Sequence, residues 1–259
     1  MSNYWAERVA KAQLALSNKS LKKIEKQLAF YYGATAKRVI ADFEATYNKV
    51  LLQQVEGKQV TPADLYKLDA YWQMQGQLRQ ELRKLGEKQI SLLTKEFETN
   101  FFEIYYSLNI EGATAFSTID TAGAMQLINS IWVADGKTFS QRIWENTEKL
   151  VETLNEQLIH CVTTGKKTTE LKKILQERFG VSYNNADMIA RTELAHVQTE
   201  AAKQRYKDYG VEQVEIWADP DERTCEICGK LHQKKYPTGA HVPIPAHPRC
   251  RCCIVPVID

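Results

Sequence analysis

Residues 21–55, LKKIEKQLAFYYGATAKRVIADFEATYNKVLLQQV, indicate the class of fold that this chain adopts. Apolar side chains recur there at helical spacing, beginning with Leu21, Ile24 and Leu28, so that they share one face of a helix. The same face continues at Tyr31, Val39, Phe43 and Tyr47. Comparable patterns extend over most of the first two hundred residues, and we therefore predict a mainly α-helical protein.

Short turn signals divide the first half of the chain. Glu56-Gly57 is a plausible helix stop, because glycine tolerates the left-handed conformation that ends helices. Thr61 and Pro62 form a strong helix start, as an N-cap followed by the first helical position. Gly86 is expected either to break the second helix or only to dent it. Long helices joined by short turns fold back on each other, which predicts a helical hairpin or bundle.

Beyond residue 136 the helical pattern resumes and ends at Gly165. A short helix is expected to follow and to end at Gly180, with Ser182 capping a further helix that stops at Gly210. From Val211 the stretch VEQVEIWA alternates apolar and polar residues, which predicts a β-strand.

These patterns divide the chain into three parts. We expect a helical arm or bundle over residues 1–115, a second helical part over 116–210, and a small β-containing module over 211–259. The last part has few large apolar residues. Small modules of this kind need a staple or must pack on a neighbour.

Composition excludes several classes of protein and points to a metal site. The chain has 259 residues, a net charge of +2 and 44% hydrophobic residues, as expected of an ordinary globular protein. The N-terminus lacks the pattern of a secretory signal, and no apolar run approaches the ~20 residues that span a bilayer. We therefore expect synthesis in a reducing cytosol. Five of the six cysteines lie between Cys225 and Cys253, and in that compartment clustered cysteines favour metal binding.

The cysteine cluster has the spacing of a zinc site. Cys225 and Cys228 form a C-x-x-C turn, and His247 and Cys250 form an H-x-x-C pair. Together they offer the four nitrogen and sulfur ligands that tetrahedral zinc prefers, in a zinc-ribbon-like arrangement. Cys252 is the alternative fourth ligand. Packing of free cysteines as small hydrophobes and a redox or catalytic use are the competing interpretations.

The remaining cysteines and histidines have other expected roles. Cys253 would point away from the ion and join a core, and Cys161 is expected to be buried on a helix. His232 and His241 lie between the two ligand pairs and are interpreted as surface or hydrogen-bonding residues rather than ligands.

No catalytic residues are predicted. A closed four-ligand zinc site leaves no position for substrate or water. The sequence has no H-E-x-x-H, Walker A or G-x-S-x-G motif. Arg191, Glu193 and His196 lie at helical spacing, and we interpret them as a charged helix face or as a buried polar network that ties this helix to the zinc module.

Basic residues gather in two regions. Residues 1–60 carry ten basic and five acidic side chains, which indicates a solvated helix face or a surface for DNA or an acidic protein. The cysteine-bearing tail, residues 225–259, has five basic side chains against two acidic ones. These five are candidates for contact with DNA phosphates: Lys230, Lys234, Lys235, Arg249 and Arg251.

An ordered set of residues in the second half resembles the phage Mu F-like head morphogenesis family, over roughly residues 130–258. The elements are, in chain order, Ala190-Arg191-Thr192-Glu193, Tyr209-Gly210-Val211, Trp217, Asp221-x-Arg223-Thr224-Cys225-x-x-Cys228, Leu231-His232 and Pro245-x-His247-Pro248-x-Cys250-Arg251-Cys252. The helical first half is similar in style to the N-terminal regions of such proteins.

The resemblance implies a minor head protein of a tailed bacteriophage. Such proteins occur in a few copies in the procapsid or head at the portal vertex, and some are implicated in DNA packaging or ejection. The expected partners are the portal protein, scaffold or major capsid protein and double-stranded DNA, with no membrane. The expected location is the head interior or portal vertex of the virion, and the host cytoplasm during assembly.

The resemblance also implies which residues form the functional site. Cys225, Cys228, His247 and Cys250, or Cys252 in its place, match the family's metal positions, while Arg191 and Glu193 match motif positions without assigned chemistry. Some relatives carry toxin domains beyond the shared region. Because this chain stops soon after the cysteines, we expect no such domain. The closed zinc site and the lack of catalytic motifs lead us to expect no enzyme activity. The alternatives are a zinc-dependent nucleic-acid-binding module or a zinc- or transferase-type enzyme.

Overall fold

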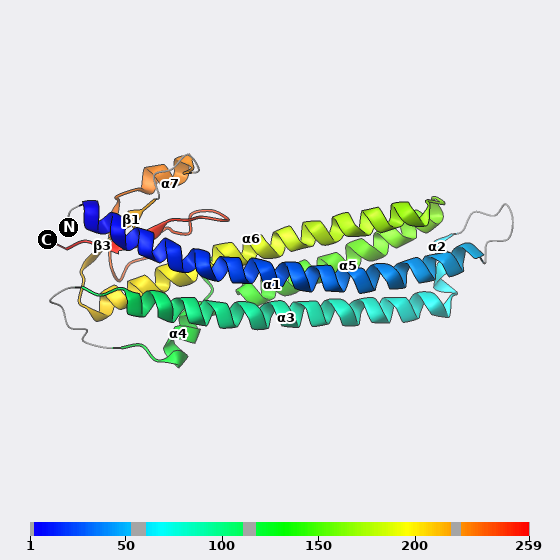
Figure 1. Ribbon diagram of the computed structural model, residues 1–259, viewed down its shortest axis with the longest axis horizontal. Helices are drawn as coiled ribbons and strands as arrows, with labels where there is room; N and C mark the ends of the chain where they lie inside the picture. The colour runs from blue at the N-terminus through cyan, green and yellow to red at the C-terminus, as the bar shows by residue number, and fades with distance from the viewer. Residues whose placement is uncertain (1–2, 53–60, 111–117, 219–223, 259) are drawn as a thin grey trace. The chain divides into compact units, whose positions relative to one another are not determined.

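The computed structural model describes residues 3–52, 61–110, 118–218 and 224–258. It is mainly helical with a small C-terminal strand region, which confirms the predicted fold class. The elements are α1 (Asn3–Leu52), α2 (Pro62–Tyr66), α3 (Asp69–Ser107), α4 (Thr121–Ile128), α5 (Phe139–Thr163), α6 (Thr168–Asp208), β1 (Gln213–Trp217), α7 (Glu226–Leu231), β2 (Lys235–Pro237) and β3 (Cys253–Pro256) (Figure 1). Within the described ranges, no helix combines the length and the apolar character needed to cross a membrane.

The chain forms two compact units, and long helices contribute segments to both. Unit 1 consists of Met1–Glu25, Leu92–Phe139 and Met188–Asp259, and unit 2 of Lys26–Ser91 and Ser140–Asp187. The sequence-based boundary at 115–116 lies outside the described residues, so the three-part division stays a prediction.

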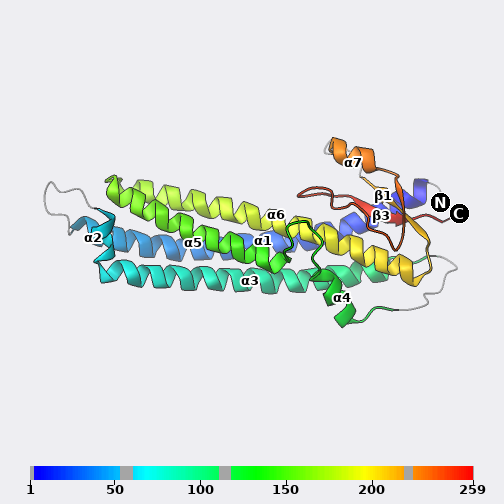
Figure 2. The same ribbon diagram turned by 180° about the vertical axis from the view of Figure 1, so that it is seen from behind.

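Unit 2 consists of helical segments packed side by side. Segments of α1, α3, α5 and α6 run alongside one another in it, as both views of the long helices show (Figures 1 and 2). The periodic apolar positions found in the sequence face the interior, where burial of each side chain stabilises the unit. The buried residues include Leu28, Val39, Phe43, Tyr47, Leu78, Leu82, Ile143, Leu150, Leu154 and Leu158.

The predicted helix start at Thr61 is present. Helix α2 begins at Pro62, and the Asp64 carboxylate accepts hydrogen bonds from the Thr61 backbone N–H at 3.0 Å and from its hydroxyl at 2.7 Å. These bonds lower the pKa of Asp64 to about 2. The predicted stop at Glu56-Gly57 lies outside the described residues.

Gly86 neither breaks nor ends its helix, since α3 continues through it. A Cβ at this position would lie 2.6 Å from Cζ3 of Trp144 on α5, because the indole ring packs directly against the glycine. The glycine therefore serves helix packing rather than helix termination.

The predicted break between Gly180 and Ser182 is wrong, because α6 is continuous from Thr168 to Asp208. One glycine inside a helix costs only about 1 kcal/mol, which packing of its neighbours outweighs. Ser182 is buried, and its carbonyl accepts hydrogen bonds from the Tyr32 hydroxyl at 3.2 Å and the Asn146 amide at 2.9 Å. These partners from α1 and α5 hold Ser182 inside the helix instead of at a cap.

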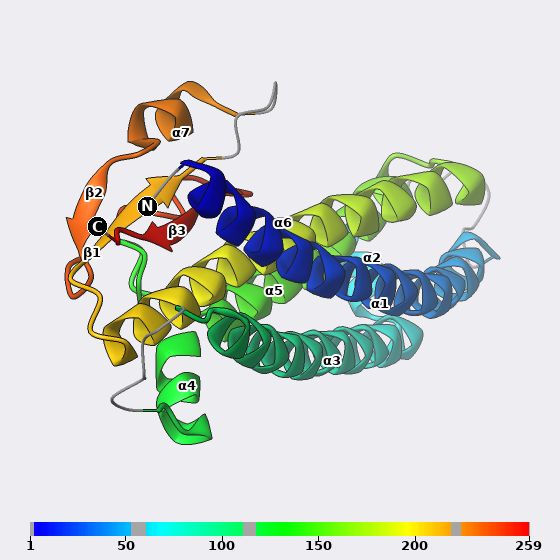
Figure 3. The same ribbon diagram turned by 60° about the vertical axis from the view of Figure 1, so that its left-hand side comes forward.

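Unit 1 carries the sheet. Its strand order is β2-β1-β3, and the central strand β1 pairs antiparallel with both neighbours. Trp217 on β1 and Cys253 and Val255 on β3 pack against Ala6 and Ala10, on the α1 segment that lies beside the sheet (Figure 3).

Hydrogen bonds reinforce this packing. The Gln13 side-chain amide on α1 donates to the carbonyl of Ile254 on β3 at 2.9 Å. Gln13 is fully buried, and this bond satisfies a polar group that would otherwise be costly to bury. The C-terminal strand is thus attached to the N-terminal helix.

Candidate metal centre

The C-x-x-C turn lies at the start of α7. Cys225 is the N-cap of this helix, and its sulfur accepts a hydrogen bond from the Cys228 backbone N–H at 3.4 Å. The turn of the helix brings the Cys228 sulfur back towards the Cys225 sulfur, so the local backbone alone orients two of the predicted ligands toward one point.

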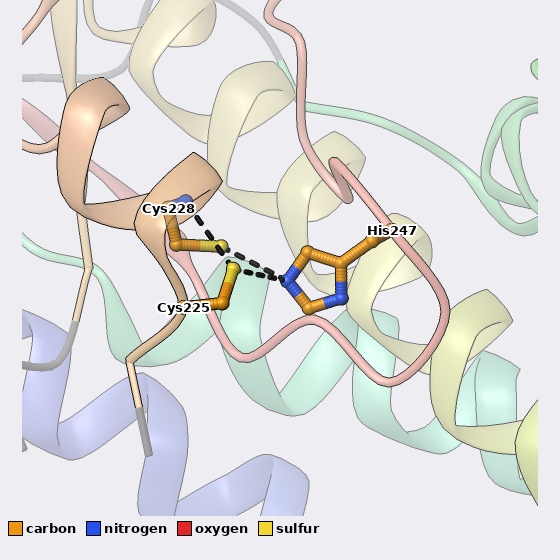
Figure 4. Close-up of side chains that lie close together, drawn as sticks. All are labelled: Cys225, Cys228 and His247. Carbon is orange, nitrogen blue, oxygen red and sulfur yellow. Dashed lines mark hydrogen bonds between the residues drawn. The ribbon is translucent and has the colours of Figure 1, made fainter. Parts of the chain in front are cut away.

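The loop before β3 supplies the other ligands. His247 Nε2 lies 3.2 Å from the Cys225 sulfur and 3.1 Å from the Cys228 sulfur (Figure 4). On the buried side, the Cys228 sulfur lies 3.7 Å from the sulfur of Cys250. His247 Nδ1 is 2.8 Å from the Pro248 carbonyl, which fixes the ring and leaves Nε2 facing the thiols.

Cys228 belongs to two overlapping ligand groups. Its sulfur lies with Cys225 and His247 in one group and with Cys250 and Cys252 in the other, and within each group the ligand atoms lie within 4.8 Å of one another. The structure therefore gathers all five sequence-predicted ligands, and both candidates for the fourth position, Cys250 and Cys252, remain close to Cys228.

The donor set fits a structural zinc ion. Thiolates and imidazole nitrogen are the ligands that zinc prefers, and two Zn–S bonds of about 2.3 Å at a tetrahedral angle hold their sulfurs roughly 3.8 Å apart. The Cys228–Cys250 separation of 3.7 Å matches this spacing. When bound, zinc would join α7 to the loop before β3 as a structural crosslink.

The environment of the thiols divides them into two kinds. A hydrogen bond from the Cys252 thiol lowers the pKa of Cys250 to about 5. The pKa of Cys252 is raised by the same pairing, and burial raises the pKa of Cys228 to about 12. Cys250 therefore ionises more readily than Cys228 or Cys252, which makes it a ready metal ligand.

The other cysteines and histidines discussed above lie outside the two candidate ligand groups. Cys253 is buried among the residues that join β1 and β3 to α1, and Cys161 is fully buried in unit 2. His232 accepts a hydrogen bond from the Ala218 backbone N–H at 3.2 Å, and its ring meets that of Trp217 edge-on at 4.9 Å. His241 is exposed.

Within the Arg191-Thr192-Glu193 motif, Thr192 contacts the ligand loop. Arg249 has a φ of 63°, in the left-handed region that few residues other than glycine adopt. Its backbone N–H donates to the Thr192 hydroxyl oxygen at 3.0 Å, which ties the loop to α6. Arg191 forms an ion pair with Glu25 of α1. The role of Thr192 had no sequence signal, because its partner lies 57 residues further along the chain.

Glu193 lies in a buried polar network on the same helix. Its carboxylate accepts a hydrogen bond from the Trp132 indole N–H at 2.9 Å. The Trp132 ring stacks on His196 at 4.5 Å, and His196 Nε2 lies 3.3 Å from the hydroxyl of Ser130. Glu193 and His196 are 3% and 4% exposed, so this network orders the 130–132 segment and offers no open cleft.

The basic candidates of the tail differ in their surroundings. Lys230 pairs with Glu226 one helical turn away, with the two charged atoms 2.5 Å apart. Lys234, Lys235 and Arg249 are exposed. The remaining candidate, Arg251, is half-buried, and the motif residues Asp221 and Arg223 lie outside the described part of the chain.

The fold and site define a class: a mainly helical protein whose small C-terminal module gathers cysteine and histidine ligands around a common centre. Residues 152–255 match the model of the family described as "Phage Mu protein F like protein". The match covers less than half of the chain, and over that part the chain is similar to the phage Mu F-like family.

One curated relative belongs to a different functional class by name. The chain is 25% identical over 185 residues to a protein named NAD(+)--arginine ADP-ribosyltransferase EFV, from Enterococcus faecalis. The alignment covers 64% of this chain and 38% of the relative, so the chain spans well under half of that protein. No solved structure matches the chain.

Proposed function

We propose that this protein is a minor head protein of a tailed bacteriophage, which acts in procapsid or head assembly at the portal vertex. The observation that supports this most directly is the match of residues 152–255 to the phage Mu F-like family. The long helical segments would engage the portal, scaffold or major capsid protein, and the C-terminal module would be held folded by zinc.

Association with heads tests this proposal. The tagged chain would be produced together with the portal, scaffold and capsid genes of its own genome, and procapsids would be separated by sedimentation. We expect a few copies per particle and co-purification with the portal protein. Absence from both procapsids and portal preparations would contradict the proposal.

A structural rather than an enzymatic role is part of the same proposal. Zinc held by Cys225, Cys228, His247 and a further cysteine leaves no position for water or substrate. The name of the Enterococcus faecalis relative suggests the assay: incubation with NAD⁺ and arginine-containing acceptor protein. We expect no release of nicotinamide. Nicotinamide release that depends on this chain would instead support an enzymatic role.

A second candidate function is nucleic-acid binding by the zinc module. The observation that favours it is the exposure of Lys234, Lys235 and Arg249 in the segment 225–259, which has five basic side chains against two acidic ones. Binding by surface charge releases counterions and weakens as salt rises. A salt titration of duplex DNA binding tests it, and absence of binding even at low salt would reject it.

A further inference from the structure

A pocket with a volume of about 220 Å³ lies in unit 1 beside the metal centre. Its walls come from α1, from α6 and from the loop segment 249–252, so three separate parts of the chain meet there. The volume is below the roughly 300–1,000 Å³ of pockets for drug-sized ligands. The pocket therefore suits a small ligand or one part of a larger one.

The wall carries concentrated positive charge. Arg191, Arg249 and Arg251 all line the pocket, two of them from the loop and one from α6. Arg191 also pairs with Glu25. A guanidinium has five N–H donors in a planar fork, so it can hold a carboxylate and donate to a second acceptor as well. Cys250 lines the same wall, and a divalent ion at the metal centre would offset the charge of its thiolate.

Hydrogen bonds fix the polar side of the pocket. The Ser17 hydroxyl donates to the side-chain carbonyl of Gln198, and the Gln198 amide donates to Gln13 at 3.5 Å. Ser17 and Gln198 are 5% and 4% exposed, so both are held in place by burial as well. Because these groups are ordered before a ligand arrives, little entropy is lost when one binds.

Apolar side chains complete the wall. Leu14 and Leu21 from α1 face the same space as Leu194 from α6. The pocket thus combines a strongly basic side with an apolar side. An anion that fits both must carry an organic group beside its charge.

We propose that this pocket binds a phosphate ester, with the phosphate held by the three arginines and the attached sugar or base against the leucines. A carboxylate is matched by one guanidinium fork, whereas a phosphate offers more acceptor oxygens and suits arginines that approach from different sides. Two sources supply this chemistry: a free nucleotide, and a single nucleotide of a DNA strand. The proposal does not depend on a role in head assembly.

Calorimetric titration of the full zinc-loaded chain tests the proposal, with three probes. Inorganic phosphate reports the anion site alone, deoxyadenosine 5′-monophosphate adds the sugar and base, and a twelve-residue single-stranded oligonucleotide represents DNA. We expect one saturable site per chain and tighter binding of the nucleotide than of inorganic phosphate. Tighter binding of the oligonucleotide than of the nucleotide identifies DNA as the source, and the reverse order identifies a free nucleotide.

Variants separate the pocket from general surface charge. Arg191→Gln removes a donor, and Asn18→Glu places a negative charge at an exposed position of the pocket wall where folding should be unaffected. We expect each to weaken binding of the nucleotide at least tenfold. Lys207→Gln removes one charge from an exposed site outside the pocket and should leave binding unchanged.

Two results would overturn the proposal. One is the absence of saturable binding by both inorganic phosphate and the nucleotide. The other is an equal loss of binding in Lys207→Gln and Arg191→Gln, which would assign the affinity to overall charge. Head association measured on the same variants keeps the two proposals separate, because it can persist when phosphate binding is lost.

Discussion

Arg249 lies in a left-handed backbone conformation that most side chains avoid, and the Thr192 hydroxyl accepts a hydrogen bond from its backbone N–H. This contact fixes the segment between His247 and Cys250, which are both predicted ligands. A helical residue outside the metal site thus positions the ligand loop, as supporting groups around metal sites commonly do.

Thr192→Val should weaken zinc binding by about tenfold, because the loop loses its anchor to α6. Competition with a chromogenic chelator measures the affinity. Thr199→Val is the matched control, since both threonines donate to the carbonyl four residues earlier on α6 but only Thr192 contacts the loop. An equal effect of the two changes would contradict this role for Thr192.

The hydrogen bond to the buried Glu193 carboxylate leads to a second prediction, which concerns stability. Trp132→Phe keeps an aromatic ring beside His196 but removes the indole N–H that donates to Glu193. Loss of a hydrogen bond to a buried charge should lower the free energy of unfolding by about 1.5–3 kcal/mol, measured by urea denaturation.

The control for Trp132→Phe is Trp72→Phe. The Trp72 indole N–H also donates a hydrogen bond, to the Tyr66 carbonyl at 2.9 Å, but this tryptophan is 57% exposed. Water can replace the lost partner there, so the change should stay within about 0.5 kcal/mol. Similar losses at both sites would show that the Glu193 network adds no particular stability.

At the scale of single elements, glycines with the same sequence signal have different roles. Gly86 accommodates the Trp144 ring, whereas nothing lies within 4 Å of the position that a Cβ would take at Gly76 on the same helix. Sequence pattern alone cannot separate these cases, because the difference lies in a residue on another helix.

Gly86→Ala should therefore destabilise the protein although alanine is the better helix former. The gain in helix propensity is about 1 kcal/mol, and forcing the indole ring aside costs roughly 1–3 kcal/mol. Gly76→Ala should instead stabilise by up to about 1 kcal/mol. Thermal unfolding of both variants measures the contrast, and stabilisation by Gly86→Ala would show that Trp144 moves aside freely.

At the scale of the whole molecule, the metal centre belongs to unit 1 alone. Its ligands all lie in the segment 188–259, while unit 2 has its own buried helical core. Structural zinc contributes on the order of 10 kcal/mol to the folding of small zinc modules. Metal removal should therefore affect the two units unequally.

Chelation should increase hydrogen exchange in β1, α7 and β3 and leave the helices of unit 2 protected. Cys228→Ser should reproduce this pattern without a chelator, because Cys228 belongs to both ligand groups. Cys161→Ser is the control: this buried cysteine lies in unit 2, so any destabilisation there should leave zinc content unchanged. Uniform loss of protection over both units would contradict the prediction.

The sequence by itself determined the helical class, the helix start at Thr61 and the candidate ligands. Each of these rests on local rules: apolar periodicity, capping chemistry and the short spacing of C-x-x-C and H-x-x-C. Ligands within such a pair are oriented by the backbone between them, so spacing alone predicts them. Local rules failed at α6, where the sequence predicts a break before Ser182 but the helix is continuous. Hydrogen bonds from residues of α1 and α5 to Ser182 stabilise the continuous helix there.

Only the tertiary structure decided how distant residues act together. The anchoring of Arg249 by Thr192, the packing of β3 on α1 and the pocket beside the metal centre all join segments far apart in the chain. Such contacts depend on which helix faces meet, and a single sequence does not encode that choice in any local pattern. Local chemistry therefore predicted the candidate ligands, whereas long-range packing placed the support and the pocket around them.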